Sequence, residues 1–177
     1  MRLVLDPPQS VGPIRIGMPF ADAEALLRGI PGYLPRKPGT RVNPGFAHYE
    51  SGLSVSVGRD RQGLVEAVEV FRPEREVSVL FRDIAVFALP AEEVTNRLQA
   101  MTPIEVQDGG GTILAPGLLL CLWRPGVPDD PEDYEGQFFQ SALVAAPGYY
   151  EETEPRTSEA PAETARVREI SGQESLF

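Results

Sequence analysis

The chain has 177 residues, with 16 lysines and arginines against 26 aspartates and glutamates, so its formal net charge is −10. Affinity for nucleic acid depends largely on cationic side chains that displace counterions, and this charge therefore argues against nucleic acid and anionic membranes as partners. One cysteine and one histidine exclude an intramolecular disulfide and a zinc site of the Cys/His type. The hydrophobic fraction of 42% is enough to bury one core.

The N-terminus has no recognisable export signal. Only a three-residue apolar run precedes Asp6 and two prolines, which is far shorter than the apolar stretch of a signal peptide. The longest apolar run, residues 118–123, is also far below the roughly 18 residues that a membrane span needs. We therefore expect a cytoplasmic protein with no membrane partner.

Two segments of the chain resemble each other. Residues 14–27 and 84–98 both read as a short strand, a proline and then apolar residues at helical spacing. Pro19 and Pro90 suit the start of a helix because the first N–H groups of a helix have no partner within it. The residues expected on the buried faces of these two helices are Ala23, Leu26, Leu27, Val94 and Leu98.

Alternating apolar residues after each helix predict strands. In the first half, residues 52–57 and 64–71 flank a turn at 60–63 and should form a hairpin. In the second half, residues 117–123 and 138–144 correspond to these strands, and the short turns favour antiparallel pairing. Because residues 117–123 are apolar on both faces, that strand is either covered on both sides, which is the default, or uses one face for binding.

The pattern predicts an α+β fold of two tandem modules, each a helix packed on a small antiparallel sheet. We assign residues 1–80 to the first module and 81–150 to the second, and we leave open whether the sheets join into one continuous sheet. Residues 151–177 hold seven acidic residues against three arginines and few large apolar groups. This composition predicts a disordered acidic tail.

Residues with catalytic chemistry are scarce. His48 is the only side chain whose ordinary pKa lies near neutrality, and its place just before a strand favours a sheet edge. Cys121 alternates with leucines, which predicts a buried thiol that reacts slowly. The chain has no Gly-x-Ser-x-Gly motif, and the glycines at 109–111 precede a strand and lack the Lys-Ser/Thr of a phosphate loop. We therefore expect neither an enzyme nor a cofactor.

Carboxylates concentrate in residues 129–135, where five of seven residues are acidic. The spacing lacks the central glycine and terminal glutamate of an EF-hand loop, and Pro131 interrupts it. A solvent-facing loop is the simplest interpretation, a recognition loop for a basic protein the sharper one, and metal binding the third. Tyr134 would supply an amphipathic anchor. The candidate partner-binding residues are Asp129, Asp130, Glu132, Asp133, Tyr134 and Glu135; we assign no catalytic or metal-binding residue.

A second, basic group consists of Arg36, Lys37 and Arg41. The prolines and glycines around them indicate a long loop and not a helix that reads nucleic acid. With three charges and no nearby aromatic residues beyond Tyr33 and Phe46, a plain surface loop is the favoured interpretation.

Residues 11–23, with the sequence VGPIRIGMPFADA, resemble the opening of small bacterial proteins that begin G-P-I-R-x-G-M. Some of these proteins are thought to act as immunity partners in toxin systems. A helix followed by three strands, used singly or in tandem, is also similar to the module of the BamE outer-membrane assembly lipoproteins and of the tandem β-lactamase inhibitor proteins. The resemblance covers residues 11–73 and 83–146, and it transfers no inhibitory residue to this chain.

Together, the acidic balance and the resemblance favour a cytoplasmic, non-enzymatic protein-binding module, an immunity-type inhibitor of a basic toxin or effector. Two alternatives stay open. One is a carboxylate-based or metal-dependent hydrolase that uses residues 129–135. The other is a scaffold subunit of a larger assembly.

Overall fold

The computed structural model describes residues 1–41, 43–75, 77–130, 132 and 134–151. The prediction for the acidic tail therefore lies almost wholly outside the described residues. The elements, in chain order, are β1 (Arg2–Asp6), β2 (Ser10–Val11), β3 (Ile14–Arg15), α1 (Phe20–Gly29), β4 (Phe46–His48), β5 (Ser54–Arg59), β6 (Val65–Phe71), β7 (Ser78–Phe81), β8 (Ile84–Ala85), α2 (Ala91–Gln99), β9 (Glu105–Gln107), the 3-10 turn η1 (Asp108–Gly110), β10 (Thr112–Ala115), the 3-10 turn η2 (Pro116–Leu118), β11 (Leu120–Trp123), α3 (Tyr134–Gln137) and β12 (Ser141–Ala145).

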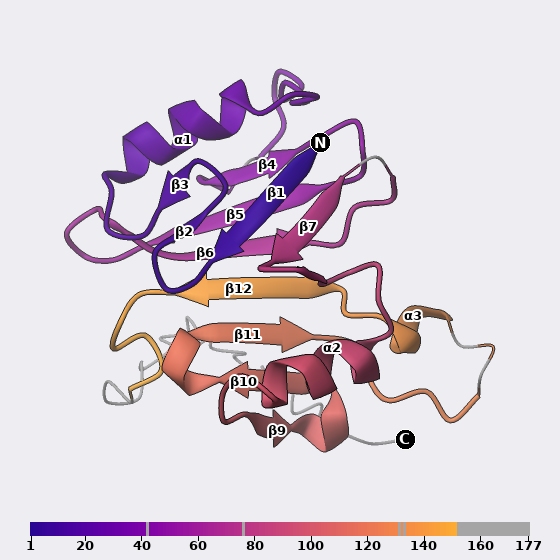
Figure 1. Cartoon of the computed structure of the whole chain (residues 1–177). Coiled ribbons are helices and arrows are strands. Elements are labelled where there is room, and N and C mark those ends of the chain that lie inside the picture. The colour runs from indigo at the N-terminus through magenta and orange to yellow at the C-terminus, as the bar shows by residue number, and fades with distance from the viewer. Residues whose placement is uncertain (42, 76, 131, 133, 152–177) are drawn as a thin grey trace, which may run out of the picture.

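Strands from both halves of the chain form one continuous seven-stranded sheet (Figure 1). Its order is β4-β5-β6-β12-β11-β10-β9, and every neighbouring pair is antiparallel. The halves meet at β6 and β12, where Val68 lies opposite Val144 and Val70 opposite Ala142. The α+β class is confirmed, and the sheets of the two predicted modules are joined.

A smaller, five-stranded sheet has the order β3-β2-β1-β7-β8. Its outer hairpins share one register: Ser10 lies opposite Arg15 in the first, and Leu80 lies opposite Ala85 in the second. Between them, β1 is antiparallel to β2 but parallel to β7. The antiparallel pairing predicted for the strands after each helix is confirmed in the large sheet. The parallel pair of β1 and β7 was not predicted, because these strands are far apart in sequence and no short turn sets their direction.

Both predicted helices are present and begin directly after Pro19 and Pro90. Burial of Ala23 and Leu27 in α1 is confirmed, as is burial of Val94 and Leu98 in α2. Leu26, in contrast, is 38% exposed, so its prediction is wrong. The buried stripe of α1 is narrow and runs through Phe20, Ala23 and Leu27, which leaves Leu26 at its border.

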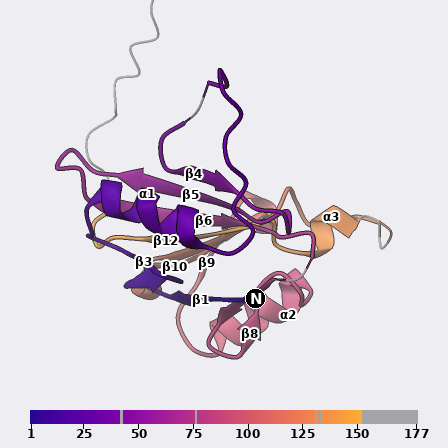
Figure 2. The same ribbon diagram turned by 90° about the horizontal axis from the view of Figure 1, so that it is seen from above.

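Both helices and the small sheet cover the same face of the large sheet (Figures 1 and 2). The covered face carries side chains that pair across the strands and are buried, such as Val55, Val70, Ala142 and Leu122. They belong to one hydrophobic cluster that also includes residues of both helices and of the small sheet. The core therefore lies between two layers, and within the described ranges no second layer of helices or strands covers the opposite face of the large sheet.

The strand predicted at residues 117–123 begins only at Leu120, because residues 116–118 form the turn η2 and Leu119 is left-handed, with φ of 54°. Leu120 and Leu122 are buried in the core, as expected. On the other face, Cys121 is half-buried and Trp123 is 46% exposed. The default expectation that this strand is covered on both sides is therefore wrong. In the part of the chain that the structure describes, no helix is long and apolar enough to cross a membrane.

Candidate binding surface and pocket

The uncovered side of the large sheet, which we call the open face, carries two rows of side chains set by the strand register. One row pairs Ser54 with Phe71, Phe71 with Ser141 and Ser141 with Trp123. Along β4, β5, β6, β12 and β11, the half-exposed or exposed residues of the two rows are Phe46, His48, Ser54, Ser56, Glu69, Phe71, Cys121, Trp123 and Leu143.

Aromatic side chains gather on the open face. The ring of Phe46 lies 4.8 Å from that of His48 and 5.9 Å from that of Phe71, centroid to centroid. Phe71 and Trp123 lie on either side of Ser141, which is buried between them in the strand register. Large aromatic groups left half-exposed on a sheet face are typical of a surface that contacts another molecule.

Tyr134, from the acidic segment 129–135, is held at the end of the large sheet, beyond the last residue of β6. The guanidinium of Arg72, directly after β6, lies 4.5 Å from the ring centroid of Phe138 and 5.1 Å from that of Tyr134. Arg72 Nη2 also donates a hydrogen bond of 3.2 Å to the hydroxyl of Tyr134. Tyr134 is nevertheless 61% exposed. Its ring is therefore both positioned and accessible, as an interface anchor requires.

The acidic segment is not an irregular loop throughout, because Tyr134–Gln137 form the short helix α3. Asp129, Asp130 and Glu132 are exposed, and the N–H of Glu132 donates to Asp130 Oδ1 at 2.9 Å. Pro131 and Asp133 lie outside the described residues, as does the side chain of Glu135. Among the described residues, no group of three or more His, Cys, Asp or Glu side chains could hold a metal ion. Partner binding by this segment stays a prediction.

Arg124 fixes the start of the connection that leads to the acidic segment. It is 6% exposed, and it donates from Nε to the carbonyl of Gly110 at 3.1 Å and from Nη1 to that of Gly136 at 3.0 Å. Burial lowers the pKa of Arg124, and the nearby Glu92 opposes this effect. The turn η1 therefore supplies the carbonyl of Gly110 as a hydrogen-bond acceptor for the buried guanidinium of Arg124. The sequence did not indicate this role.

Cys121 lies near the middle of the open face. Burial raises the pKa of its thiol, and the charges of Glu69 and Asp108 add to the effect. Burial also raises the pKa of Tyr150, with smaller contributions from Cys121, Tyr149 and Glu69. The ionisation of Tyr150, in the short segment after β12, is therefore coupled to that of Cys121.

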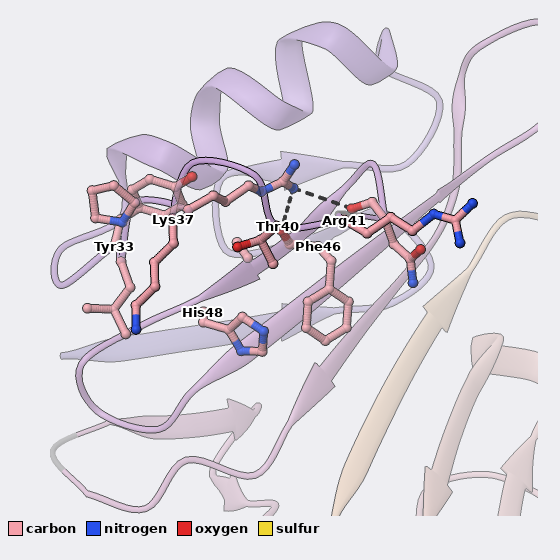
Figure 3. Close-up of a pocket in the computed structure, with 11 residues that line it drawn as sticks. Tyr33, Lys37, Thr40, Arg41, Phe46 and His48 are labelled. Atoms are coloured by element: carbon pink, nitrogen blue, oxygen red, sulfur yellow. Dashed lines mark hydrogen bonds between the residues drawn. The ribbon is translucent and has the colours of Figure 1, made fainter.

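The loop formed by residues 34–41 and 43–45 stands over β4 at the edge of the open face (Figure 2). A pocket opens between this loop and β4 (Figure 3). It has a volume of about 550 Å³. Figure 3 shows Lys37 reaching from the loop toward His48, with Phe46 beside His48 on the strand below. The lining residues are Tyr33, Leu34, Pro35, Arg36, Lys37, Thr40, Arg41, Asn43, Phe46, Ala47 and His48.

The loop is fastened at both ends. At its start, the N–H of Leu34 donates to the carbonyl of His48 at 2.9 Å. At its end, the N–H of Gly45 donates to Glu24 Oε1 at 3.0 Å. Arg36 joins the two arms, because its Nη2 donates to the carbonyls of Phe46 at 2.8 Å and Asn43 at 3.3 Å. The pocket is therefore a built feature of the fold.

Gly45 is required where the loop returns to the sheet. Its φ of +77° is left-handed, and a Cβ there would clash with the carbonyl oxygen of Val57 and lie 2.9 Å from the ring of Phe20. The interpretation of the basic residues as a plain surface loop missed this pocket. One signal was in the sequence: residues 25–49 contain no aspartate or glutamate, although the chain has 26.

Comparisons of the chain with protein-family models, with curated proteins and with solved structures return no match.

Proposed function

We propose that this chain is a cytoplasmic, non-enzymatic protein-binding module of the immunity type, which binds a basic toxin or effector through the open face and the acidic segment 129–135. The observation that carries the proposal is the presence of two accessible aromatic anchors, Trp123 and Tyr134, in the same region of the molecule. They are 46% and 61% exposed, and both lie at the end of the large sheet where the acidic segment leaves β11 and returns toward β12.

Charge and shape act together in this proposal. The exposed carboxylates Asp129, Asp130 and Glu132 attract a cationic surface and raise the rate of encounter. The aromatic rings of the open face then supply apolar area that becomes buried on contact. Most of the binding energy should therefore come from Trp123 and Tyr134, and most of the salt dependence from the carboxylates.

The direct test is co-expression with the toxin-like product of a neighbouring gene, followed by calorimetry of the purified pair. Trp123 is the only tryptophan of the chain, so its fluorescence reports on the open face. Complex formation should shift its emission to shorter wavelength and protect it from acrylamide. Trp123→Ser and Tyr134→Ser should each weaken binding by about tenfold or more, as anchor residues do.

Val4→Ser is the matched control, because Val4 is 48% exposed on β1 in the other sheet. It should leave affinity unchanged. Asp129→Asn with Asp130→Asn should slow association and flatten its dependence on salt, with little change in dissociation. A stable complex whose affinity does not respond to either anchor substitution would overturn the assignment of the surface. The absence of any complex with such a neighbour would overturn the immunity-type function.

A further inference from the structure

We propose that the pocket beneath the loop of residues 34–45, which we call the loop pocket, binds a small organic anion: a carboxylate or phosphate group carried on a flat ring. This ligand site shares Phe46 and His48 with the open face but lies at its β4 edge, several strands away from the anchor Trp123. The argument has three parts, namely the charge of the lining, its aromatic walls and the size of the space.

The charge of the lining is the first part. Arg36, Lys37, Arg41 and His48 line the pocket, and no aspartate or glutamate does. Arg36 already donates to backbone carbonyls and so mainly holds the loop in place. Lys37 and Arg41 form no ion pair with any described carboxylate. Two cations without an ion-pair partner among the described carboxylates line the same pocket, in a chain with a net charge of −10, and this favours an anionic ligand.

The walls of the pocket are the second part. Phe46 and Tyr33 line it together with Leu34 and Pro35, so an anion that enters also meets apolar surface. Tyr33 is set edge-on against the buried Tyr49 at 6.1 Å, and Phe46 lies against His48 and Phe71. Both rings are thus held by neighbours. Rigid aromatic walls beside positive charge fit a flat ring that bears an acidic group.

Size is the third part. A volume of about 550 Å³ is far larger than a bare phosphate or acetate ion needs, and it falls within the range of about 300 to 1,000 Å³ that is common for sites of small organic ligands. His48 adds a polar group on the floor of the pocket. Its Nδ1 lies 2.8 Å from the hydroxyl of Ser54, which fixes the ring and directs Nε2 away from that hydrogen bond.

The test uses the full chain and four probes at constant ionic strength: phenyl phosphate, benzoate, inorganic phosphate and phenol. Calorimetry or two-dimensional NMR should show saturable binding of phenyl phosphate, of benzoate or of both. Inorganic phosphate and phenol should bind at least about tenfold more weakly, because each lacks one half of the recognised chemistry. The difference between phenyl phosphate and benzoate distinguishes a phosphate ligand from a carboxylate ligand.

Variants locate the site. Lys37→Gln and Arg41→Gln should each weaken the better probe by about five- to tenfold, as is typical for the loss of one charge-assisted contact. The double variant should bring binding close to the detection limit. Arg61→Gln, in the exposed turn between β5 and β6, is the matched control and should change nothing. All variants should keep the wild-type melting temperature, because the two loop cations are exposed.

The proposal is overturned if neither phenyl phosphate nor benzoate saturates in the millimolar range. It is also overturned if the double variant binds the probes as well as the wild type does, or if Arg61→Gln weakens binding equally. None of these results bears on Trp123 and Tyr134, so the protein-binding function stands or fails on its own experiment.

Discussion

At the scale of single residues, Tyr49 joins the first helix to the sheet. It is 2% exposed, and its hydroxyl donates a hydrogen bond of 2.8 Å to the carbonyl of Leu27 in the last turn of α1. Burial raises the pKa of Tyr49, and the neighbouring Tyr33 adds to the effect. The folded protein therefore retains this proton at a pH where the unfolded chain releases it.

This shift makes folding stability depend on alkaline pH. The contribution of Tyr49 is fully present below the ordinary tyrosine value of 10.0 and is lost as the pH rises above it. Tyr49→Phe should lower the free energy of unfolding by about 1 kcal/mol at pH 7, through the lost hydrogen bond. It should also flatten part of the decline in the free energy of unfolding above pH 10. The rest of the decline should remain in part, because burial raises the pKa of Tyr150 too. Urea unfolding between pH 7 and 11 measures both effects, and an unchanged alkaline slope would contradict this account.

Arg124 is the second residue with a distinct energetic role. Arg124→Met keeps an unbranched side chain of similar length but removes the donors to the carbonyls of Gly110 and Gly136. We expect the free energy of unfolding to fall by about 2 kcal/mol, since the lost hydrogen bonds are buried and charge-assisted. Arg97→Met is the control, because Arg97 pairs with Glu93 on an exposed helix face and should cost at most about 0.5 kcal/mol. Equal losses in the two variants, measured by urea unfolding, would refute the role of Arg124.

At the scale of elements, the spacing of apolar residues predicted those elements that are stabilised by contacts close in sequence. The two helices and the hairpin of β5 and β6 follow from apolar spacing and from the turn at 60–63, where Asp60 Oδ1 accepts from the N–H groups of Gln62 and Leu64. In the small sheet, β3 and β8 were predicted as the short strands at the start of the two similar segments, but β1, β2 and β7 had no such signal. Strands β2, β3 and β8 have two residues each, and β1 pairs with a strand more than seventy residues away.

The candidate sites also divide into one that is contiguous in sequence and two that are assembled by the fold. The acidic segment is contiguous, so composition alone revealed it. The open face is not, because Phe71 and Trp123 come together only through the pairing of β6 with β12 and of β12 with β11. The loop pocket likewise needs His48 to lie in the edge strand β4 and the basic loop to fold over it. Both sites therefore form only through the register between strands that are far apart in sequence, and no short sequence motif encodes this register.

The environment of Cys121 in β11 gives a prediction at this scale. Because burial and nearby acidic groups raise the pKa of the thiol, little thiolate is present at pH 8. Its reaction with a disulfide reagent should be at least about tenfold slower in the folded protein than in urea. Tyr150→Ala should speed the reaction, because Tyr150 is electrostatically coupled to Cys121, and Tyr134→Ala, at the end of the large sheet, should not. A folded thiol that reacts as fast as the unfolded one would rule out this environment.

At the scale of the whole molecule, charge is distributed unevenly around the open face. The acid-free stretch of residues 25–49 contributes the basic loop at the β4 edge, and the acidic segment follows β11 toward the other half. A partner with a basic surface would therefore meet attraction near Trp123 and repulsion near Lys37. This asymmetry favours a single orientation of the partner on the sheet.

The continuous sheet and the shared core also determine how the molecule unfolds. Residues 1–80 and 81–150 were assigned to separate modules, yet β6 of the first pairs along five residue positions with β12 of the second, from Ala67 to Phe71. The small sheet joins the same halves a second time through β1 and β7. We call each of these two strand pairings between the halves a seam. Together with the one hydrophobic cluster between the layers, the two seams predict that both halves unfold as a single cooperative unit.

Val68→Ala tests this cooperativity, because Val68 is fully buried and lies opposite Val144 across the seam. The free energy of unfolding should fall by about 2 kcal/mol, as is usual when a core side chain is shortened. Hydrogen exchange of the slowest amides in β5 and in β11 should report the same loss, since both strands open only when the whole sheet does. Val106→Ala, on the 61% exposed edge position of β9, should change neither strand. A loss confined to β5 would show that the halves unfold separately, and the seam would then be an interface between two independent modules.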